Sequence, residues 1–434
     1  MEKTFGDLVP FADPPWYQAI KSPYYNESHA RLRAAVRQYV EKELRPHAEE
    51  WEVEGKIPDE AFKKHAEQGF VAAAIWPLPK EDMKKLGTKL PGGVHPDEWD
   101  AFHDFICHDE LMRIGYLGVN WGISTTGNVI GFPPVVEFGT HPLKSELVPQ
   151  VLRGEKRFCL GVTEPDAGSD VGGITTTAEK ARDGTHYLVN GAKKWITNGV
   201  FADYMTTAVR TGGPGASGIS VLVVPLDTPG VTRRKIHNSG VNASGSTYVE
   251  LDNVKVPVSN LLGKEGEGFK IIMSNFNHER LWLSYQANRM SRCCVEDALL
   301  HAMNRQAFGK ALIEQPVIRA KLSEMGRHVA ASHALLEQLV YHFSRSTRAE
   351  SDADLAGLIA LAKVQCTRSL EIVNREAQQV LGGLGYQRGG RGGRIEQISR
   401  DLRVMVVGGG SIEIVSDLAM KQGLNSARRK GAKI

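Results

Sequence analysis

The stretch STYVELDNVKVPV, residues 246–258, decides the fold class, because it marks a β-rich region between two long helical regions. Apolar and polar residues alternate along it, as in a strand that buries one face. Other segments upstream share this β character: TTTAEK (175–180) and THYLVNG (185–191), which flank the turn pair Asp183-Gly184, and the β-branched run GISVLVVPL (218–226). The sequence from about residue 158 to 257 therefore predicts a compact sheet domain.

Helical patterns lie on both sides of this region. Before it, an apolar residue recurs at every fourth position, at Leu32, Val36, Val40 and Leu44, and Pro58 opens a further helix. From Gly266 onward, long helical patterns return and are broken by the glycine-rich stretches 382–393 and 408–410. The order predicts an α+β protein with an all-α domain at 1–157, a β domain at 158–264 and a helical domain at 265–434.

Composition excludes several classes of protein. The chain has 434 residues, of which 41% are hydrophobic, so it can bury a large core. Its 53 Lys and Arg residues against 50 Asp and Glu residues give a net charge of +3, which argues against a general nucleic-acid binder. No apolar run approaches the roughly 18 residues of a membrane span. The five cysteines lack metal-ligand spacing, so we expect reduced thiols and no metal site.

The two ends of the chain differ in what they suggest. The N-terminus has no basic region followed by an apolar one, so we expect no secretory or mitochondrial leader. The last three residues, Ala432-Lys433-Ile434, have the small, basic, aliphatic order of the peroxisomal S-K-L address, although they also fit an ordinary solvated tail. We expect a peroxisomal location, with a cytoplasmic or mitochondrial one as the alternative.

Four motifs point to one family. The segments are GVTEPDAGSD (161–170), KKWITNG (193–199), NRQAFGK (304–310) and QQVLGGLGY (378–386). In this order and spacing they closely resemble the acyl-CoA dehydrogenase family, and the resemblance covers the chain from about Ser28 to Gln422. It implies an oxidoreductase that acts on CH–CH bonds with FAD. The fold it implies has a helical N-terminal domain, a β-barrel-like middle domain and a C-terminal four-helix bundle.

The resemblance assigns the first two motifs to the flavin ring. Thr163 and Ser169, with Val162 and Gly168 in the same loop, would bind its pyrimidine edge. Trp195 would pack against the ring, with Thr197 near the reactive N5. The alternatives are an ordinary polar turn and a core tryptophan.

The later motifs are assigned to the other half of FAD. Arg305 would reach across a subunit interface to the diphosphate, which a guanidinium can bind with two charge-assisted hydrogen bonds, and Phe308 would pack against the adenine. The alternative is a helix C-terminus closed by Gly309. Other residues implied to contact the cofactor are Gln315, Gln379, Gly382, Gly383, Ser411 and Glu413. FAD binding would then require a homodimer or, as we expect, a homotetramer.

The stretch VVGGGSIEI, residues 406–414, lacks the residue that many relatives use as a base. In those relatives a glutamate near this point removes the α-proton of an acyl-CoA. Aligned on Arg400-Asp401, that glutamate falls at Gly409. Glu413 lies four residues further on, where the family tends to place a residue beside the flavin, so we disfavour it as the base.

A second branch of the family, which includes isovaleryl- and long-chain-type enzymes, carries its base on a helix directly before an arginine. In NFNHERLWL (275–283), Glu279 and Arg280 take these places. Glu279 shares one helical face with Ile272, Phe276 and Leu283. Burial on such a face raises the pKa of a carboxylate above about 4.3, which suits a general base near neutrality. The alternative is a salt bridge, for example with Arg289 or Arg292.

The predicted substrate is an acyl-CoA thioester, and the residues expected to contact it are Ser169, Asn277, Arg280 and Gly409. Its electrons would pass to an electron-transfer flavoprotein or to oxygen. Two other hypotheses stay open at this point. One is an oxidase on the same fold, and the other is a flavin-binding interaction protein that has lost catalysis. We expect no nucleic-acid partner.

Two segments depart from the family pattern. The loop QRGGRGGRI (387–395) is about three residues longer than usual, and its RGGRGG run favours an interface loop over an RNA-binding segment. The N-terminal stretch FADPPWYQAIKSPYYNESH (11–29) lies largely outside the shared region. We expect it to form an arm over a neighbouring subunit.

Overall fold

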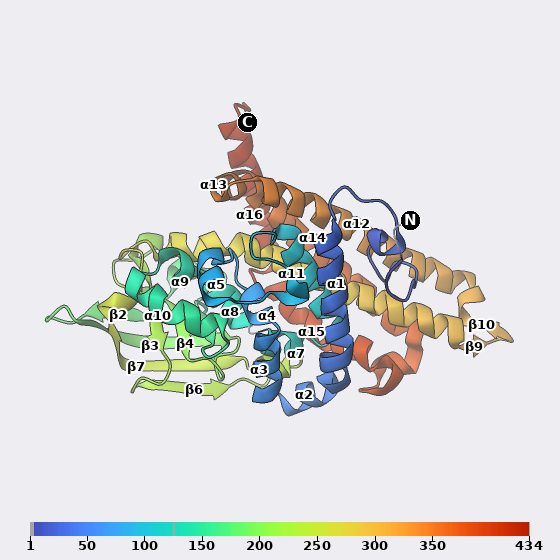
Figure 1. Ribbon diagram of the computed structural model, residues 1–434, viewed down its shortest axis with the longest axis horizontal. Coiled ribbons are helices and arrows are strands. Elements are labelled where there is room, and N and C mark those ends of the chain that lie inside the picture. The colour runs from blue at the N-terminus through green and yellow to red at the C-terminus, as the bar shows by residue number, and fades with distance from the viewer. Residues whose placement is uncertain (1–3, 125, 434) are drawn as a thin grey trace. The chain divides into compact units, whose positions relative to one another are not determined.

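The computed structural model describes residues 4–124 and 126–433 (Figure 1). Its contacts divide the chain into two compact units that are each built from separate stretches. Unit 1 combines residues up to 49, residues 99–117 and residues from 280 onward, and unit 2 combines residues 50–98 and 118–279. The domain boundaries expected near residues 157 and 264 stay predictions.

Unit 2 contains the predicted sheet. Its strands are β1 (Phe158–Gly161), β2 (Thr177–Lys180), β3 (His186–Ile196), β4 (Tyr204–Arg210), β5 (Ile219–Pro225), β6 (Val231–Lys235), β7 (Thr247–Pro257) and β8 (Leu261–Leu262). They pair in the order β6-β7-β3-β2-β4-β5-β8, and β1 pairs with β4. The expectation of a barrel-like sheet is wrong. In the described part of the chain the sheet stays open, because no pairing joins its end strands β6 and β8.

Alternation along β7 sets which face of the sheet is buried. Val249, Leu251, Val254 and Val256 are buried, whereas most residues between them are exposed. β5 is different, because six consecutive residues from Ile219 to Val224 are buried, which explains why its sequence is rich in β-branched residues and does not alternate. β3 and β7 run antiparallel and lie side by side in Figure 1. The register between them shifts twice, between Val189 and Gly191 and between Lys193 and Ile196.

Short helices complete unit 2. They are most of α2 (Ala48–Glu54), α3 (Asp59–Glu67), α4 (Phe70–Ala73), α5 (Lys80–Leu86), most of α7 (Leu117–Ile123), α8 (Thr126–Gly131), α9 (Pro133–Phe138), α10 (His141–Leu152) and the beginning of α11 (Gly268–Asn304). Pro58 is the N-cap residue of α3, so it opens a helix as predicted. α8 is tied to the sheet, because the side chain of Asn128 accepts a hydrogen bond of 2.6 Å from the backbone N–H of Phe158.

Helices, most of them long, dominate unit 1. They are α1 (Glu27–Tyr39), α6 (Ala101–Leu111), the rest of α11, α12 (Pro316–Arg345), α13 (Arg348–Glu350), α14 (Ala356–Leu381), α15 (Gly393–Val407) and α16 (Ile412–Arg429). A hairpin, β9 (Gln306–Ala307) and β10 (Lys310–Ala311), links α11 to α12. α14 packs against α12, α15 and α16. The four-residue apolar repeat is confirmed, since Leu32, Val36, Val40 and Leu44 are all buried.

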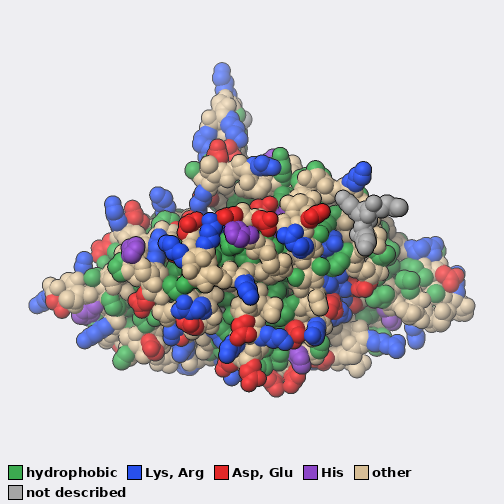
Figure 2. Space-filling model, viewed as in Figure 1, with side chains coloured by type: hydrophobic (Ala, Val, Ile, Leu, Met, Phe, Trp, Pro, Cys, Tyr) green, Lys and Arg blue, Asp and Glu red, His purple; other side chains and the backbone are tan. Residues whose placement is uncertain are grey.

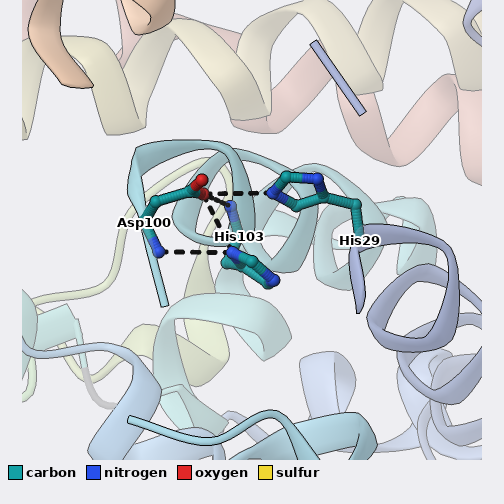
Figure 3. A group of neighbouring side chains, drawn as sticks. All are labelled: His29, Asp100 and His103. Atoms are coloured by element: carbon teal, nitrogen blue, oxygen red, sulfur yellow. Dashed lines mark hydrogen bonds and ion pairs between the residues drawn. The ribbon is translucent and has the colours of Figure 1, made fainter. Parts of the chain in front are cut away.

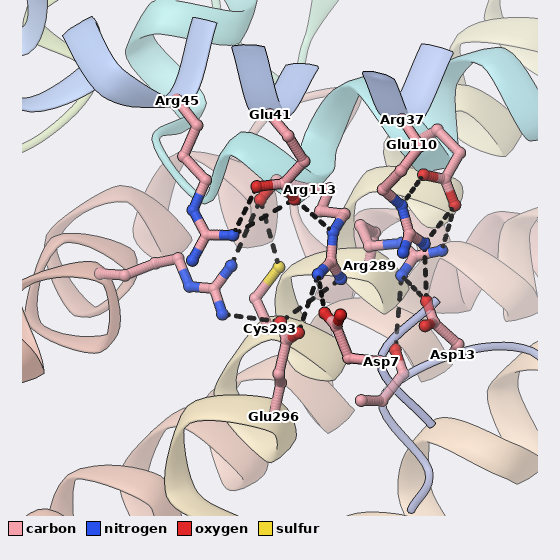
Figure 4. Close-up of polar contacts among 12 residues, drawn as sticks. Asp7, Asp13, Arg37, Glu41, Arg45, Glu110, Arg113, Arg289, Cys293 and Glu296 are labelled. Atoms are coloured by element: carbon pink, nitrogen blue, oxygen red, sulfur yellow. Dashed lines mark hydrogen bonds and ion pairs between the residues drawn. The ribbon is translucent and has the colours of Figure 1, made fainter. Parts of the chain in front are cut away.

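A buried ionic network joins α1, α6 and α11 in unit 1 (Figure 4). Arg289 of α11 is fully buried and donates hydrogen bonds to Asp13, Asp109 and Glu110. Glu110 also accepts from Arg37 at 2.6 Å. Burial alone would raise the pKa of Glu110, but the two guanidinium groups hold it below its ordinary value. All three side-chain nitrogens of Arg289 are engaged here, which disfavours its alternative role as a partner of Glu279.

The N-terminal arm packs on its own chain, and the expectation that it covers a neighbouring subunit stays a prediction. Tyr17 is buried and donates a hydrogen bond of 2.5 Å to Glu110. Arg33 lies over the rings of Phe5, Trp16 and Tyr17, with its guanidinium carbon 4.0 to 4.6 Å from their centroids. The arm completes the ionic network through Asp13, a contribution that no sequence pattern indicated.

The glycine-rich loop 387–395 is also internal in part. Arg394 is buried and pairs with Glu296 and Asp297 of α11. Arg394 is the second residue of α15, which begins at Gly393. This arginine therefore serves the packing of unit 1, which argues further against an RNA-binding loop.

Two helix caps interlock at the N-termini of α1 and α6 (Figure 3). Asn26 and Asp100 each accept backbone N–H groups of the following turn, and the histidine three residues later bonds back to the N-cap backbone. His29 Nε2 also lies 3.1 Å from Asp100 Oδ1. The ligand atoms of His29, Asp100 and His103 lie within 4.8 Å of one another, as in a metal site. However, His29 Nδ1 accepts a hydrogen bond from the backbone N–H of Asn26, so the ring carries its proton on Nε2. This proton faces the Asp100 carboxylate.

We predict that Asp100→Ala lowers the stability of the protein. The change removes an acceptor for the N–H groups of Phe102 and His103 and the partner of His29, and the loss of an N-cap costs about 0.5–2 kcal/mol. Thermal unfolding measures it. Asp100→Asn is the control, because asparagine caps helices about as well. Equal melting temperatures for wild type and Asp100→Ala would contradict the prediction.

The surface is of mixed charge. Figure 2 shows acidic and basic side chains interspersed over the visible face. This agrees with the small net charge. Among the described residues, no helix is long and apolar enough to cross a membrane.

Candidate active site

The loop after β1 carries the first group of predicted flavin contacts, in unit 2. Val162 is buried and Thr163 is half-buried, whereas Gly168 and Ser169 are exposed. Glu164 is buried and accepts hydrogen bonds from Lys193 Nζ at 2.7 Å and from the backbone of Thr175 at 2.6 Å. The loop therefore presents its hydroxyl groups outward from a buried, charged anchor.

The second group lies at the end of β3, beside this loop. The backbone N–H of Lys194 donates to the carbonyl of Thr163 at 2.9 Å, so the two segments are joined. Trp195 lies in the register shift of β3, has a φ of +65° and is 53% exposed. A bulky residue in left-handed backbone is strained, and such strain clusters at functional sites. The alternative of a core tryptophan is wrong, and Thr197 is half-buried nearby in sequence.

The predicted base also belongs to unit 2, on the first part of α11. Glu279 is half-buried, and its Oε2 atom is buried. Asn277 and His278 are buried. His278 stacks on Trp76, with ring centroids 5.4 Å apart and planes inclined by 13°. The aromatic contact engages His278 and leaves the carboxylate beside it as the candidate for proton transfer.

The triple-glycine turn lies in unit 1 and is held by two cations. Lys363 of α14 is buried, and its Nζ donates to the carbonyls of Val406 at 3.0 Å and Gly410 at 2.8 Å. Arg280 Nε donates to the carbonyl of Gly409 at 3.4 Å. Gly409 and Gly410 have φ values of +65° and +93°, which favour glycine. The turn therefore requires glycine for its backbone, besides the space that a missing side chain leaves.

The segment NRQAFGK is not a helix end closed by Gly309, so that alternative is wrong. α11 ends at Asn304, and the next residues form the β9–β10 hairpin. Phe308 and Gly309 turn the hairpin with φ values of +53° and +77°, the backbone of a tight two-residue turn. Arg305 is exposed and Phe308 is 94% exposed. Both side chains are available to a second molecule.

The other predicted cofactor contacts in unit 1 are accessible. Gln379, Gly382 and Gly383 are exposed at the end of α14, and an added Cβ at either glycine would meet open space. Gln315 is the N-cap residue of α12. These groups offer side-chain amides and accessible backbone at the end of α14 and at the start of α12.

Ser411 and Glu413 lie at the N-terminus of α16, where Ser411 is the N-cap residue. Glu413 is exposed. Hydrogen bonds from its own backbone N–H and from Ser411 hold its pKa below its ordinary value. A lowered pKa makes a carboxylate a weaker base, which supports its exclusion.

The structure thus groups the predicted residues into two sets. Unit 2 holds Val162, Thr163, Gly168, Ser169, Trp195, Thr197, Asn277 and Glu279, and unit 1 holds Arg280, Arg305, Phe308, Gln315, Gln379, Gly382, Gly383, Gly409, Ser411 and Glu413. The loop 162–169 and the segment 195–197 are brought together directly.

Two buried lysines were missed from the sequence. Lys193 lies on β3 at alternate positions with the buried Tyr187 and Val189, and Lys363 lies on the helical stripe of Ile359 and Cys366. A charged residue at a position that should face the core was the available signal. It was applied to Glu279 but not to these lysines.

Comparisons with known proteins identify the family. The models of the acyl-CoA dehydrogenase N-terminal, middle and C-terminal domains match residues 26–155, 159–254 and 266–424. The acyl-CoA dehydrogenase AFT10-1 of Alternaria alternata is 46% identical over 97% of both chains. A crystal structure described as a putative acyl-CoA dehydrogenase from Mycobacterium smegmatis is 34% identical, with a TM-score of 0.83 over 93% of this chain and 100% of that one.

A third comparison concerns the cofactor. The glutaryl-CoA dehydrogenase of Mycobacterium smegmatis, solved in complex with FADH2, is 25% identical, with a TM-score of 0.77 over 94% of this chain and 97% of that one. Together with the motifs at the two segments 161–170 and 193–199, these matches are conclusive. The chain belongs to the acyl-CoA dehydrogenase family, and it is an oxidoreductase of acyl-CoA thioesters.

Proposed function

We propose that the protein catalyses the FAD-dependent α,β-dehydrogenation of an acyl-CoA thioester with Glu279 as the general base. The observation that carries the proposal is the joined pair of segments in unit 2, the loop after β1 and the end of β3, which presents hydroxyl groups and an exposed, strained tryptophan. Family membership gives the reaction class. Because position 409 is a glycine where many relatives carry the catalytic glutamate, the base must be another residue.

The residues present fit a flavin. The indole of Trp195 is 53% exposed, and a flat partner that covers it would remove its apolar surface from water. Thr163 and Ser169 offer hydroxyl groups beside it, and Arg305 offers a free guanidinium for a diphosphate. When bound, FAD would accept the β-hydride of the substrate.

Glu279 would take the α-proton. Its carboxylate lies on a largely apolar stripe of α11, with one oxygen buried, which is a setting that suits a positioned general base. Within unit 2, the buried Asn277 and the exposed Ser169 are the proposed contacts of the CoA thioester, and Arg280 and Gly409 stay predicted contacts within unit 1.

Product analysis tests this function. The purified protein is incubated with a saturated acyl-CoA and an artificial electron acceptor, and the thioester is analysed by mass spectrometry. The expected product has lost two hydrogen atoms. Acyl-CoA recovered unchanged across chain lengths and branched acyl groups would reject the proposal.

An oxidase on the same fold is the second candidate, and a peroxisomal address would favour it. The C-terminal residue Ile434 of the predicted address lies outside the described residues, so the location stays a proposal. Hydrogen peroxide formed in proportion to enoyl-CoA in air would identify an oxidase. Product formation that needs an electron-transfer flavoprotein or an artificial acceptor would identify a dehydrogenase.

We predict that Arg305→Ala lowers FAD affinity by roughly ten- to a hundredfold, the value of a hydrogen bond to a charged group. The family resemblance implies that this diphosphate contact comes from a second chain, and Arg305 is exposed beside the hairpin, where a second molecule can reach it. FAD occupancy and oligomeric state are measured together by flavin absorbance and light scattering. Lys310→Ala, an exposed cation on the same hairpin, is the control. Full flavin retention by a monomeric protein would contradict both this prediction and the proposed homotetramer.

A further inference from the structure

The lysine at position 193 is a buried charge at the centre of unit 2. Its side chain is 0% exposed. Its Nζ donates to the carbonyl of Val162 at 3.1 Å and to Glu164 Oε1 at 2.7 Å. Burying an ammonium group is costly unless it is well paired. A site that retains such a group on a sheet of buried valines needs a reason beyond packing.

Glu164, the partner of Lys193, joins the loop after β1 to the residues that precede β2. Glu164 accepts the backbone N–H groups of Thr175 at 2.6 Å and Thr176 at 3.0 Å, as well as the Thr175 hydroxyl. The carboxylate thereby closes the loop that contains Gly168 and Ser169. Lys193 attaches this closed loop to β3.

The same lysine precedes the strained segment. Lys193 still pairs with Val249 of β7, and pairing resumes only at Ile196, so Trp195 lies in the irregular stretch between them. On the other side, Asn198 is buried, and its side chain bonds the backbone of Trp121, Gly127 and Ser244. Trp195 and Thr197 are therefore held between two buried polar anchors.

We propose that Lys193 is a positioning residue for the flavin, which fixes the loop 162–169 against the segment 195–197 so that their side chains meet one ligand. This role rests on the proposed function. Lys193 does not touch the reacting atoms. It acts through the Val162 carbonyl and through Glu164.

The positioning role predicts that FAD binding depends on the charge of Lys193. A lysine that serves packing alone would show no such dependence. Burial lowers the pKa of Lys193 to about 8, although Glu164 opposes the shift. Glu164 is the charged group that acts on it, since the neighbouring β7 residue in register, Val249, is neutral. The lysine in the unfolded chain titrates near 10.5. The unfolded state therefore binds more protons between these values, and the contribution of Lys193 to folding stability rises with pH in that window.

Deprotonation of Lys193 should weaken its hydrogen bonds to Val162 and Glu164, because they are then no longer charge-assisted. It should not unfold the protein, because the contribution of Lys193 to stability rises over the same pH range. We expect the FAD dissociation constant of the wild type, measured by flavin fluorescence, to rise roughly fivefold between pH 7 and pH 9.5, the difference between charged and neutral donors. The melting temperature of the apoprotein reports the fold at each pH.

Two variants complete the experiment. Lys193→Met should bind FAD at least tenfold more weakly at pH 7 and lose the pH dependence. Lys235→Met is the matched control, because Lys235 lies on β6 of the same sheet and donates to a single carbonyl, that of Gly55. It should keep the wild-type affinity and pH profile.

Each outcome decides the role. A Lys193→Met protein with the wild-type affinity and pH profile overturns the positioning role alone. If that variant does not fold, the wild type decides, and a dissociation constant that stays flat to pH 9.5 overturns the role. Wild-type protein that binds no FAD at any pH overturns the proposed function, and the positioning role with it.

Discussion

The variant Glu279→Gln should fold and bind FAD like the wild type but lose most flavin reduction by acyl-CoA. Amide and carboxylate are nearly isosteric, so the packing around the buried Oε2 atom is kept. The amide cannot accept the α-proton, and a positioned general base contributes roughly a hundred- to ten-thousandfold to rate. The rate of flavin reduction under anaerobic conditions, followed by stopped-flow absorbance, measures the loss. Reduction at the wild-type rate would show that the base lies elsewhere.

Two further variants make this result specific. Glu413→Gln should do much less harm, because the pKa of Glu413 is already lowered by hydrogen bonds at the N-terminus of α16. Gly409→Glu in the Glu279→Gln background should recover part of the rate if the two positions face one α-carbon. Recovery should be incomplete, because position 409 has a φ of +65°, where a side chain is strained by roughly 1 kcal/mol.

The second large effect is on stability. Arg289→Met should destabilise the protein by about 3–5 kcal/mol, the usual result of removing one partner of a buried ion pair. The change removes the guanidinium that Asp13, Asp109 and Glu110 share in the interior of unit 1, so that Asp109 loses this partner while Asp13 and Glu110 keep their pairs with Arg37. Denaturation by urea, followed by circular dichroism, measures the loss. The control is Arg327→Met, since Arg327 pairs with Glu324 on the exposed face of α12, where an ion pair contributes at most about 1 kcal/mol. Equal losses in the two variants would contradict the ionic network.

The same network sets a pH dependence. The pKa values of Asp13 and Glu110 are lowered in the folded protein by Arg37 and Arg289. Lowered carboxylate pKa values stabilise the fold above the unfolded pKa of about 4, and that stability is lost as the pH falls through the folded values. The wild type should therefore lose more stability than Arg289→Met between pH 5 and pH 3.

The sequence predicted those parts of the fold that follow from local periodicity. The four-residue repeat from Leu32 to Leu44 and the alternation along β7 each bury one face, so a pattern of side chains is enough to define them. The openness of the sheet depends on whether β6 and β8 pair, which is a long-range fact that no local pattern contains. The contacts of the N-terminal arm could not be predicted for a similar reason, because its partners on α1, α6 and α11 are distant in sequence.

The candidate site shows the same division. The motifs located Thr163, Ser169 and Trp195, yet the left-handed backbone of Trp195 arises from a shift in pairing with β7 that the sequence does not show. The hairpin at Phe308 was mistaken for a helix end, because a glycine after an apolar pattern fits both structures. Lys193 and Lys363 were detectable in principle, since each interrupts a buried pattern. Their partners, which are mostly backbone carbonyls, leave no trace in the sequence.

The central claim is that this protein oxidises an acyl-CoA with its own flavin. The most direct test is an anaerobic titration of the purified, FAD-loaded protein with a panel of straight and branched acyl-CoAs, followed by the visible absorbance of the flavin. The account predicts that at least one thioester bleaches the flavin and that Glu279→Gln stays oxidised on the same time scale. A flavin that stays fully oxidised in the wild type with every thioester would contradict it.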